Sequence, residues 1–420
     1  NVTLVGGSIT GGSITGGNNV GAVVGNANNT TITNVTNSAA VNGKDNVGGI
    51  VGRADNTLVQ DAINTGTITG NANVGGLVGN LQNSEFVEAT ADNKEIRKGI
   101  LGNSYNLGAV TGGGANVGGL VGYAENSTIG DGTNLVYNRL DVKGAYNVGG
   151  IVGNMEGTTV QNAENSGNVT ATGYDINGKY TYHTAETNRD KIQNVTWNDD
   201  GTVTATVNVA NVGGIAGNSS NSTINDVENT GDVSSSKQNG NDYYDAGNVG
   251  GIVGSAVDTN ISNATNRENE VRGAHNVGGV AGYFGNSNDD NNIKYTINRG
   301  INDGGDIMAT GARKESSFVT EIIRPSNENQ TEEFIIGNIG GIAGYMDGDN
   351  VYITGSGNRG TVHTDEPADP ADVKEWQKAA NVGGVVGKID RSNTKQLNSQ
   401  NEIVDASGNK AQAAVSDSYN

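Results

Sequence analysis

The chain has 420 residues and a formal net charge of −20 at pH 7, and 67 of its residues are glycine, 3 are proline and none is cysteine. Glycine at more than twice its usual share of about 7%, with so little proline, excludes collagen and proline-rich linkers, and the lack of cysteine excludes disulfide frameworks and thiolate metal sites. The negative charge disfavours binding to nucleic acid, and no apolar run approaches the ~18 residues needed for insertion into a membrane.

A short motif recurs along the whole chain and predicts a repeat protein. It runs Asn-Val-Gly-Gly, an aliphatic residue, Val or Ala, and Gly, with small variations, and its copies begin at Asn19, Asn46, Asn73, Asn116, Asn147, Asn211, Asn248, Asn276, Asn338 and Asn381. The shortest intervals are 27 and 28 residues, the length of one solenoid coil. We therefore expect an all-β fold, a right-handed parallel β-helix (solenoid) of about 27-residue coils, forming a single domain over residues 1–420. Because the chain begins with Asn1, we expect it to be a fragment of a longer protein.

Each coil is expected to contain three short strands joined by three turns. In the coil that begins at Asn46, the predicted strands contain residues 47–51, 57–59 and 67–69, each bounded by Gly, Asn or Asp. One coil buries too few aliphatic side chains to offset its backbone entropy, so the coils must stack. The paired glycines mark a corner that excludes a Cβ, although Ala22 indicates that the second glycine tolerates a methyl group.

A second asparagine follows the motif at a nearly fixed distance of 18 residues, and the triplet that begins at Asn298 is interpreted as another copy of this marker. Equivalent asparagines in stacked coils can form hydrogen bonds through their side-chain amides. We expect Asn37, Asn64, Asn165 and Asn229 to form such a structural ladder rather than a ligand site.

The segment from Asn46 to Gly79 resembles the GLUG repeat, a motif named for its Gly-Leu-hydrophobic-Gly core. The resemblance is carried by residues 47–52, 64–70 and 75–79. GLUG repeats occur in bacterial surface adhesins and in the non-catalytic region of streptococcal immunoglobulin A1 proteases. The resemblance therefore implies an exported bacterial protein with a β-solenoid, and it supplies no catalytic residue.

Four segments depart from the regular repeat and are expected to be insertions: residues 81–104, 174–209, 301–336 and 361–380. Most of the extra length follows the second asparagine, so most insertions should leave the solenoid at one corner, whereas residues 81–104 arise from the other half of their coil.

Local patterns predict structure within the insertions. Alternating residues 192–197 and 202–207 around Asn-Asp-Asp-Gly predict a β-hairpin. Aliphatic runs within residues 318–336 predict paired strands or a loop docked on the solenoid. Asp369 as N-cap and Pro370 at the first helical position predict a short helix that continues through Trp376.

The insertions also hold the residues that we expect to contact a ligand. Both tryptophans, Trp197 and Trp376, lie there with Tyr180 and Tyr182. Aromatic side chains beside acids and amides suit recognition of a sugar or a protein. The alternative is that they anchor the loops on the scaffold.

Acidic clusters are the candidates for metal binding, and they comprise Asp199 and Asp200, Asp289 and Asp290, and Asp347 and Asp349. Their Asn and Gly neighbours favour solvated turns. Calcium binding is the alternative, since this cation takes hard oxygen ligands, and catalysis by these carboxylates is least favoured. No other cofactor is expected, and we expect the histidines, His183, His275 and His363, to be isolated on the surface.

These features predict a non-enzymatic adhesin or stalk, secreted or on the bacterial cell surface, whose rigid scaffold presents recognition loops to a protein or glycan of a host or neighbouring cell. Two alternatives stay open. One is a self-assembling subunit of an extracellular fibre or surface layer, and the other is the solenoid arm of a large surface protease.

Overall fold

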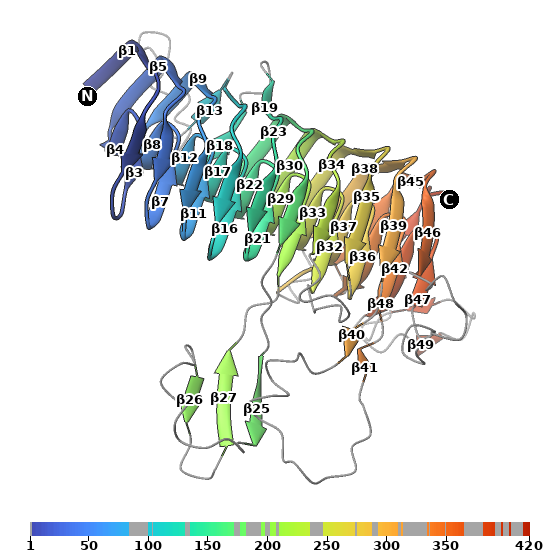
Figure 1. Ribbon diagram of the computed structural model, residues 1–420. Helices are drawn as coiled ribbons and strands as arrows, with labels where there is room; N and C mark the ends of the chain where they lie inside the picture. Colours follow the sequence, from blue (N-terminus) through green and yellow to red (C-terminus); the bar gives the residue numbers. More distant parts are fainter. Residues whose placement is uncertain are drawn as a thin grey trace, which may run out of the picture.

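The computed structural model confirms an all-β chain folded as a parallel β-helix, an elongated stack of coils (Figure 1). The structure describes residues 2–83, 100–102, 104–130, 135–171, 177–181, 195–197, 202–206, 210–235, 247–273, 275–287, 293–309, 312–313, 334–335, 337–348, 350–364, 381–390, 396–397, 403–404 and 415–420. Within these ranges the chain forms no helix, and so none that could cross a membrane.

Each regular coil contributes strands to four parallel sheets, named sheets A to D in the order in which the chain enters them, so the expectation of three strands per coil is wrong. Sheet A contains β1 (Val2–Ile9), β5 (Thr30–Asn37), β9 (Leu58–Asn64), β13 (Ile100–Gly102), β14 (Tyr105–Asn106), β18 (Thr128–Ile129), β19 (Val136–Asn138), β23 (Thr159–Asn165), β30 (Thr223–Asn229), β34 (Asn260–Arg267), β38 (Tyr295–Asp303), β44 (Val351–Thr354), β45 (Gly357–Asn358) and β51 (Val415–Ser416). Sheet B contains β2 (Ser13–Thr15), β6 (Ala40–Asn42), β10 (Ile68–Gly70), β15 (Val110–Gly112), β20 (Val142–Gly144), β24 (Val169–Ala171), β31 (Val233–Ser235), β35 (Glu270–Gly273), β39 (Asp306–Ala309) and β46 (Thr361–Thr364).

The other two sheets divide the glycine motif between them. Sheet C contains β3 (Val20–Gly21), β7 (Asp45–Gly48), β11 (Ala72–Gly75), β16 (Ala115–Gly118), β21 (Tyr146–Gly149), β28 (Asn211–Gly213), β32 (Asn248–Gly250), β36 (Asn276–Gly278), β42 (Asn338–Gly340) and β47 (Asn381–Gly383). Sheet D contains β4 (Val24–Asn28), β8 (Val51–Asp55), β12 (Val78–Gln82), β17 (Val121–Glu125), β22 (Val152–Glu156), β29 (Ala216–Ser220), β33 (Val253–Val257), β37 (Ala281–Gly285), β43 (Ala343–Asp347) and β48 (Val386–Asp390).

The bend between sheets C and D explains why one expected strand is two. It falls at the middle of the glycine motif, where the next coil lies directly against the backbone. A Cβ on Gly48 would lie 2.7 Å from the carbonyl oxygen of Leu77, and a Cβ on Gly49 would meet the Gly76 carbonyl and lie 2.6 Å from the Asn64 Cγ. In this interior coil the second glycine therefore excludes a methyl group, and the tolerance inferred from Ala22 does not extend beyond the first coil.

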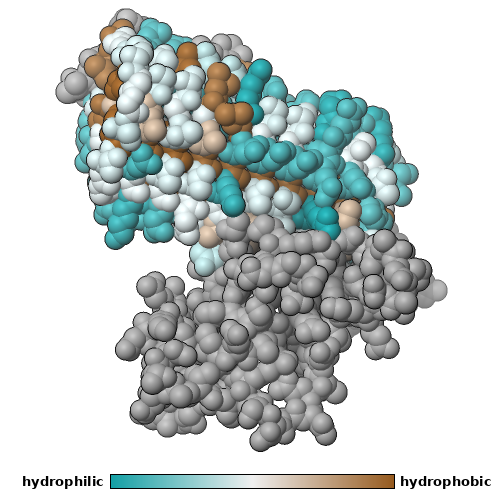
Figure 2. Space-filling model, in the orientation of Figure 1, coloured by the Kyte–Doolittle hydropathy of each residue, from teal (hydrophilic) through white to brown (hydrophobic). Residues whose placement is uncertain are grey.

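The coils stack with equivalent residues in register. Val47 of β7 pairs with Val20 of the preceding coil and with Val74 of the following one. The aliphatic side chains form two buried clusters, one between sheets A and D, with Val59 and Leu81, and one between sheets B and C, with Val47 and Ile68. Figure 2 shows that hydrophobic residues reach the visible face only as a narrow line along the axis and as patches toward the N-terminal half.

Segments that interrupt the regular coil leave mainly between sheet B and sheet C. Residues 172–209, 236–246, 310–336 and 365–380 all connect a strand of sheet B to the next strand of sheet C. Two predicted insertion boundaries start too early, because β39 continues the solenoid to Ala309 and β46 continues it to Thr364. The predicted helix from Asp369 through Trp376 lies outside the described residues.

The early insertion leaves the solenoid at a different place, between sheet D and sheet A. The expected segment 81–104 was too wide, because Leu81 and Gln82 belong to β12 and residues 100–102 form β13. Only residues 84–99 and 103 of this range lie outside the described residues.

Small antiparallel sheets lie within the insertions. The predicted hairpin is present as β26 (Val195–Trp197) and β27 (Thr202–Thr206), and β25 (Asn177–Thr181) pairs with the other edge of β27. The strand β40 (Ala312–Arg313) pairs with β41 (Phe334–Ile335), and β49 (Gln396–Leu397) pairs with β50 (Ile403–Val404).

The close approach of neighbouring coils at the C–D bend predicts that replacing a glycine there destabilises the protein more than replacing a glycine elsewhere. We expect Gly49→Ala to lower the free energy of unfolding by about 1–3 kcal/mol, because its Cβ meets packed backbone and the Asn64 side chain. Gly113→Ala is the matched control, because the nearest atom to its Cβ is 3.6 Å away. Thermal unfolding followed by circular dichroism measures both, and an equal loss in the two variants would contradict this account of the motif.

Candidate functional site

An unbroken ladder of asparagine side chains runs through the interior of the solenoid, between the A–B corner and the C–D bend. Asn37, Asn64, Asn165 and Asn229, which the sequence predicts to stack, all belong to it. Nine hydrogen bonds of 2.6–3.1 Å, each from the Nδ2 of one asparagine to the Oδ1 of the next, link Asn37, Asn64, Asn106, Asn138, Asn165, Asn229, Asn266, Asn302, Asn358 and Asn420. We call this set the inner ladder.

The backbone orients each amide of the inner ladder. Asn64 illustrates this, because its Nδ2 donates to the carbonyl of Gly66 at 2.8 Å and its Oδ1 accepts from the Gly66 amide at 3.2 Å, in addition to the bonds with its ladder neighbours. The amide of Asn64 is therefore satisfied by protein partners although it is fully buried. Such side chains have a structural role and leave no group for a ligand.

One predicted marker is wrong, because Asn302 and not Asn298 continues the inner ladder. Asn298 pairs with Ser262 and Asn302 pairs with Asn266, so the two asparagines lie four residues apart on β38. Asn298 is exposed, and its Oδ1 accepts a hydrogen bond from the Thr354 Oγ1 at 3.4 Å.

A second ladder, which the sequence reasoning missed, is built from the motif asparagines themselves. Nine hydrogen bonds of 2.8–3.0 Å link Asn19, Asn46, Asn73, Asn116, Asn147, Asn211, Asn248, Asn276, Asn338 and Asn381. In this outer ladder each Nδ2 donates to the preceding coil, whereas in the inner ladder each Nδ2 donates to the following coil. The sequence did contain a signal for this ladder, because Asn recurs at the first position of every copy of the motif.

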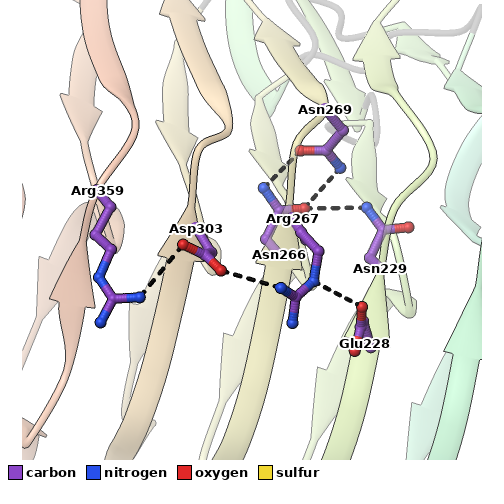
Figure 3. A network of polar contacts seen from close by, with 7 residues as sticks. All are labelled: Glu228, Asn229, Asn266, Arg267, Asn269, Asp303 and Arg359. Carbon is purple, nitrogen blue, oxygen red and sulfur yellow. Dashed lines mark hydrogen bonds and ion pairs between the residues drawn. The ribbon is translucent and has the colours of Figure 1, made fainter.

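Charged side chains also link coils, on the outer side of sheet A. Arg267 bridges Glu228 at 2.9 Å and Asp303 at 3.1 Å, and Arg359 contacts Asp303 at 3.4 Å (Figure 3). These side chains are 29–61% exposed, so each pair contributes little, at most about 1 kcal/mol. The chain of charges holds neighbouring coils together and presents no unpaired group.

A polar groove lies at the corner between sheets D and A in the N-terminal half of the solenoid. It has a volume of about 790 Å³ and is lined by Asn28, Asn29, Asp55, Asn56, Asn83, Asn126, Ser127, Thr128, Gly157 and Thr159. We call it the corner groove. Its lining holds amide, carboxylate and hydroxyl groups but no apolar side chain larger than the methyl of threonine and no cation, so it suits a neutral polar ligand.

The fold places these corner asparagines by their backbone conformation. Asn29, Asn56, Asn83 and Asn126 have φ between +46° and +57°, a left-handed conformation that Asn tolerates better than most residues. Each lies ten residues after the first asparagine of its motif. That spacing was visible in the sequence, but nothing local indicated that these side chains meet across coils.

Hydrogen bonds hold the corner groove in shape. The Asp55 carboxylate accepts from the Asn28 Nδ2 at 3.2 Å and from the Asn83 Nδ2 at 2.9 Å, and the Asn56 Nδ2 donates to the Asn29 Oδ1. Asp55 thus connects three successive coils, so the wall of the groove is preformed.

Asp347, one of the predicted calcium ligands, lies on the outer face of sheet D among aromatic residues. The Tyr283 hydroxyl donates to its Oδ2 at 3.1 Å, and the Tyr283 and Tyr345 rings lie edge to face with centroids 5.5 Å apart. Burial, with the charges of Asp347 and Asp390, raises the pKa of Tyr345 to about 12, so its hydroxyl stays protonated and donates to Asp390 at 3.4 Å. Lys388 stacks over the Tyr345 ring.

Calcium binding stays a prediction. Asp199, Asp200, Asp289, Asp290 and Asp349 lie outside the described residues. Within the described ranges, no group of three or more His, Cys, Asp or Glu side chains is arranged to hold a metal ion.

Two of the residues predicted to contact a ligand are brought into one row. Tyr180 of β25 and Trp197 of β26 both pair with Val203 of the central strand β27. The hairpin prediction did not include β25, so the sequence did not indicate this juxtaposition. Tyr182 and Trp376 lie outside the described residues.

The histidines differ from the surface prediction in one case. His363 is half-exposed, and its Nε2 lies 3.0 Å from the Asp306 Oδ1. His275, in contrast, is partly buried, and this burial, with a smaller contribution from the positive charge of Lys388, lowers its pKa to about 4. His183 lies outside the described residues.

Comparisons of the chain with protein-family models, with curated proteins and with solved structures find no match.

The inner ladder predicts a large cost for removing one amide. We expect Asn165→Ala to lower the free energy of unfolding by about 3 kcal/mol, because it leaves the Asn138 Nδ2, the Asn229 Oδ1 and the Gly167 carbonyl without their buried partner. Glu164→Ala, at the preceding and partly exposed position, is the control and should cost less than about 1 kcal/mol. Urea denaturation measures both, and comparable losses would argue against the ladder as a stabilising element.

His275 predicts a dependence of stability on pH. Its folded-state pKa of about 4 lies below the ordinary value of 6.5, so the unfolded chain binds the proton more tightly and stability falls as the pH falls from 6.5 to 4. The contribution is at most about 3 kcal/mol. We expect the unfolding free energies of the native chain and of His275→Gln to converge, or cross, as the pH is lowered through this window. A constant difference between them would refute the assignment.

Proposed function

We propose that the protein is a non-enzymatic adhesin or stalk, secreted or on the surface of a bacterial cell, in which a rigid solenoid presents recognition loops. The observation that supports this most is the position of the long insertions. Residues 172–209, 236–246, 310–336 and 365–380 leave at the B–C corner of the C-terminal half of the stack, whereas residues 84–99 and 391–414 connect sheet D to sheet A. Loops on a rigid scaffold vary without disturbing its hydrogen bonds, and binding residues concentrate there.

The scaffold keeps these loops in a fixed series. Successive strands of a sheet lie about 4.8 Å apart, and register pairs equivalent residues such as Val249 and Val277. The two asparagine ladders join every coil to the next, so neighbouring loops stay on one side of the axis. Figure 1 shows the small sheets β25–β27 and β40–β41 together below the lower edge of the solenoid.

The insertion of residues 172–209 is the leading candidate for ligand contact. It contains the three-stranded sheet β25–β27, whose register aligns Tyr180, Val203 and Trp197. Aromatic residues in such rows are frequent in binding surfaces for sugars and proteins. The resemblance of residues 46–79 to GLUG repeats is in keeping with an extracellular binding role.

The proposal predicts that adhesion is lost when the two largest B–C loops are removed and the solenoid is kept. Deleting residues 172–208 leaves two residues between Ala171 and Asn211, the same number that joins β20 to Asn147 in the preceding coil. Deleting residues 310–335 restores a two-residue connection between Ala309 and Asn338 in the same way. We expect beads coated with the double deletion to lose retention on cultured epithelial cells and on an array of host matrix proteins.

The matched control is a deletion at the other corner. Removing residues 84–98 leaves one residue between Asn83 and Ile100, as between Asn56 and Leu58. This variant should retain binding, and circular dichroism should show the same β content for all variants. Retention that survives the double deletion but not the control deletion would overturn the assignment of recognition to the B–C loops.

A further inference from the structure

We propose that the corner groove is a second binding site, on the scaffold itself, and that its ligand is a neutral linear oligosaccharide lying along the solenoid axis. This site goes beyond the proposed loop function, because it belongs to the D–A corner of the N-terminal half, whereas the loops to which recognition is assigned leave the B–C corner of the C-terminal half.

The chemistry of the lining selects the class of ligand. Amide groups donate and accept hydrogen bonds, and the Asp55 carboxylate accepts them, so the groove matches the hydroxyl groups of a sugar. A phosphate or sulfate group would find no cation among the lining residues and would be repelled by Asp55 and by the net charge of −20. An apolar ligand would cover the polar amide of Asn126 without offering it a hydrogen bond.

The spacing between equivalent groups in the wall of the corner groove is close to the spacing between rings in a linear oligosaccharide. The lining residues come from five successive coils, represented by Asn29, Asn56, Asn83, Asn126 and Gly157. Adjacent coils present equivalent groups about 4.8 Å apart, close to the advance per residue of an extended sugar chain. Each ring of a linear oligosaccharide therefore meets a similar set of groups, and a longer ligand gains contacts with each coil.

Gly157 leaves space at one end of the groove. It occupies the corner position that is asparagine in the four preceding coils, and a Cβ placed on it would lie 2.5 Å from the Asn126 Oδ1. The absence of a side chain there keeps one edge of the Asn126 amide open to the groove.

A later coil fills the same corner differently. Asp258 is at the equivalent position and is 5% exposed, and its carboxylate accepts hydrogen bonds from the backbone amide and the hydroxyl of Ser287. Both oxygens of the Asp258 carboxylate thus accept hydrogen bonds from the protein itself. The groove is thus a property of particular side chains rather than of the fold, which makes it open to mutation without loss of the solenoid.

The test uses the full chain and the neutral hexasaccharides cellohexaose, mannohexaose and chitohexaose, with saturation-transfer NMR to detect binding and calorimetry to measure it. We expect at least one to bind with millimolar or tighter affinity, and the affinity to rise from the disaccharide to the hexasaccharide. If none of the three binds, or if the disaccharide binds as tightly as the hexasaccharide, the proposed axial site is wrong.

Substitution of asparagine by glycine locates the site. Asn126→Gly removes a lining amide and keeps the left-handed backbone, as Gly157 does in the next coil, so the variant should fold. We expect the affinity to fall about fivefold to tenfold. Asn221→Gly is the matched control, because Asn221 has the same corner position and a φ of +48° but does not line the groove. Equal losses in both variants would overturn the proposal.

Two further measurements separate this inference from the proposed function and from its chemical alternative. The chain without residues 172–208 and 310–335 should bind the hexasaccharide with unchanged affinity, and a loss there would place the sugar on the loops. A sulfated heparin hexasaccharide should not compete for the site, and tighter binding of that anion would contradict a neutral ligand.

Discussion

The interior of the solenoid is so narrow that each coil must place an asparagine amide against a glycine of the same coil. Asn64 lies against Gly49 and Asn165 against Gly150, and at each glycine a Cβ would also meet the carbonyl oxygen of the next coil. A buried amide is tolerated only when all its hydrogen bonds are made, and stacking in register supplies those bonds. The glycine motif and the distant marker asparagine are therefore one structural unit, although they are separated in the sequence.

The two ladders have opposite polarity, and this affects how the stack is stabilised. Along the inner ladder every Nδ2 donates toward the C-terminal end, and along the outer ladder every Nδ2 donates toward the N-terminal end. Within each ladder, aligned amides polarise one another and strengthen successive bonds. Because the two rows of dipoles oppose each other, the stack gains this cooperativity without accumulating a large dipole along its axis.

The parts that could be predicted from the sequence are those in which one residue type recurs at a constant spacing. The parallel β-helix and the stacking of Asn37, Asn64, Asn165 and Asn229 follow from such spacing. The bend between sheets C and D falls at the paired glycines, which the sequence marks as a corner, but residues 47–51 were assigned to one strand because Val47, Ile50 and Val51 flank the glycines closely. Asn298 was preferred to Asn302 because the triplet after it resembles the marker, whereas register across coils decides the ladder.

The corner groove could not be predicted because it depends on contacts between residues 27 to 43 positions apart. Its asparagines are of the same residue type as those of the ladders, but their surroundings differ. An inner ladder amide such as Asn64 is enclosed by the coils above and below and by its own turn, so the protein uses every donor and acceptor. At the corner the backbone of Asn126 is left-handed, and its side-chain amide borders an open groove. Asparagine therefore has two roles in this solenoid. Inside, it links the coils through buried hydrogen bonds, and at the D–A corner it forms a surface wall of hydrogen-bonding groups that repeats from coil to coil.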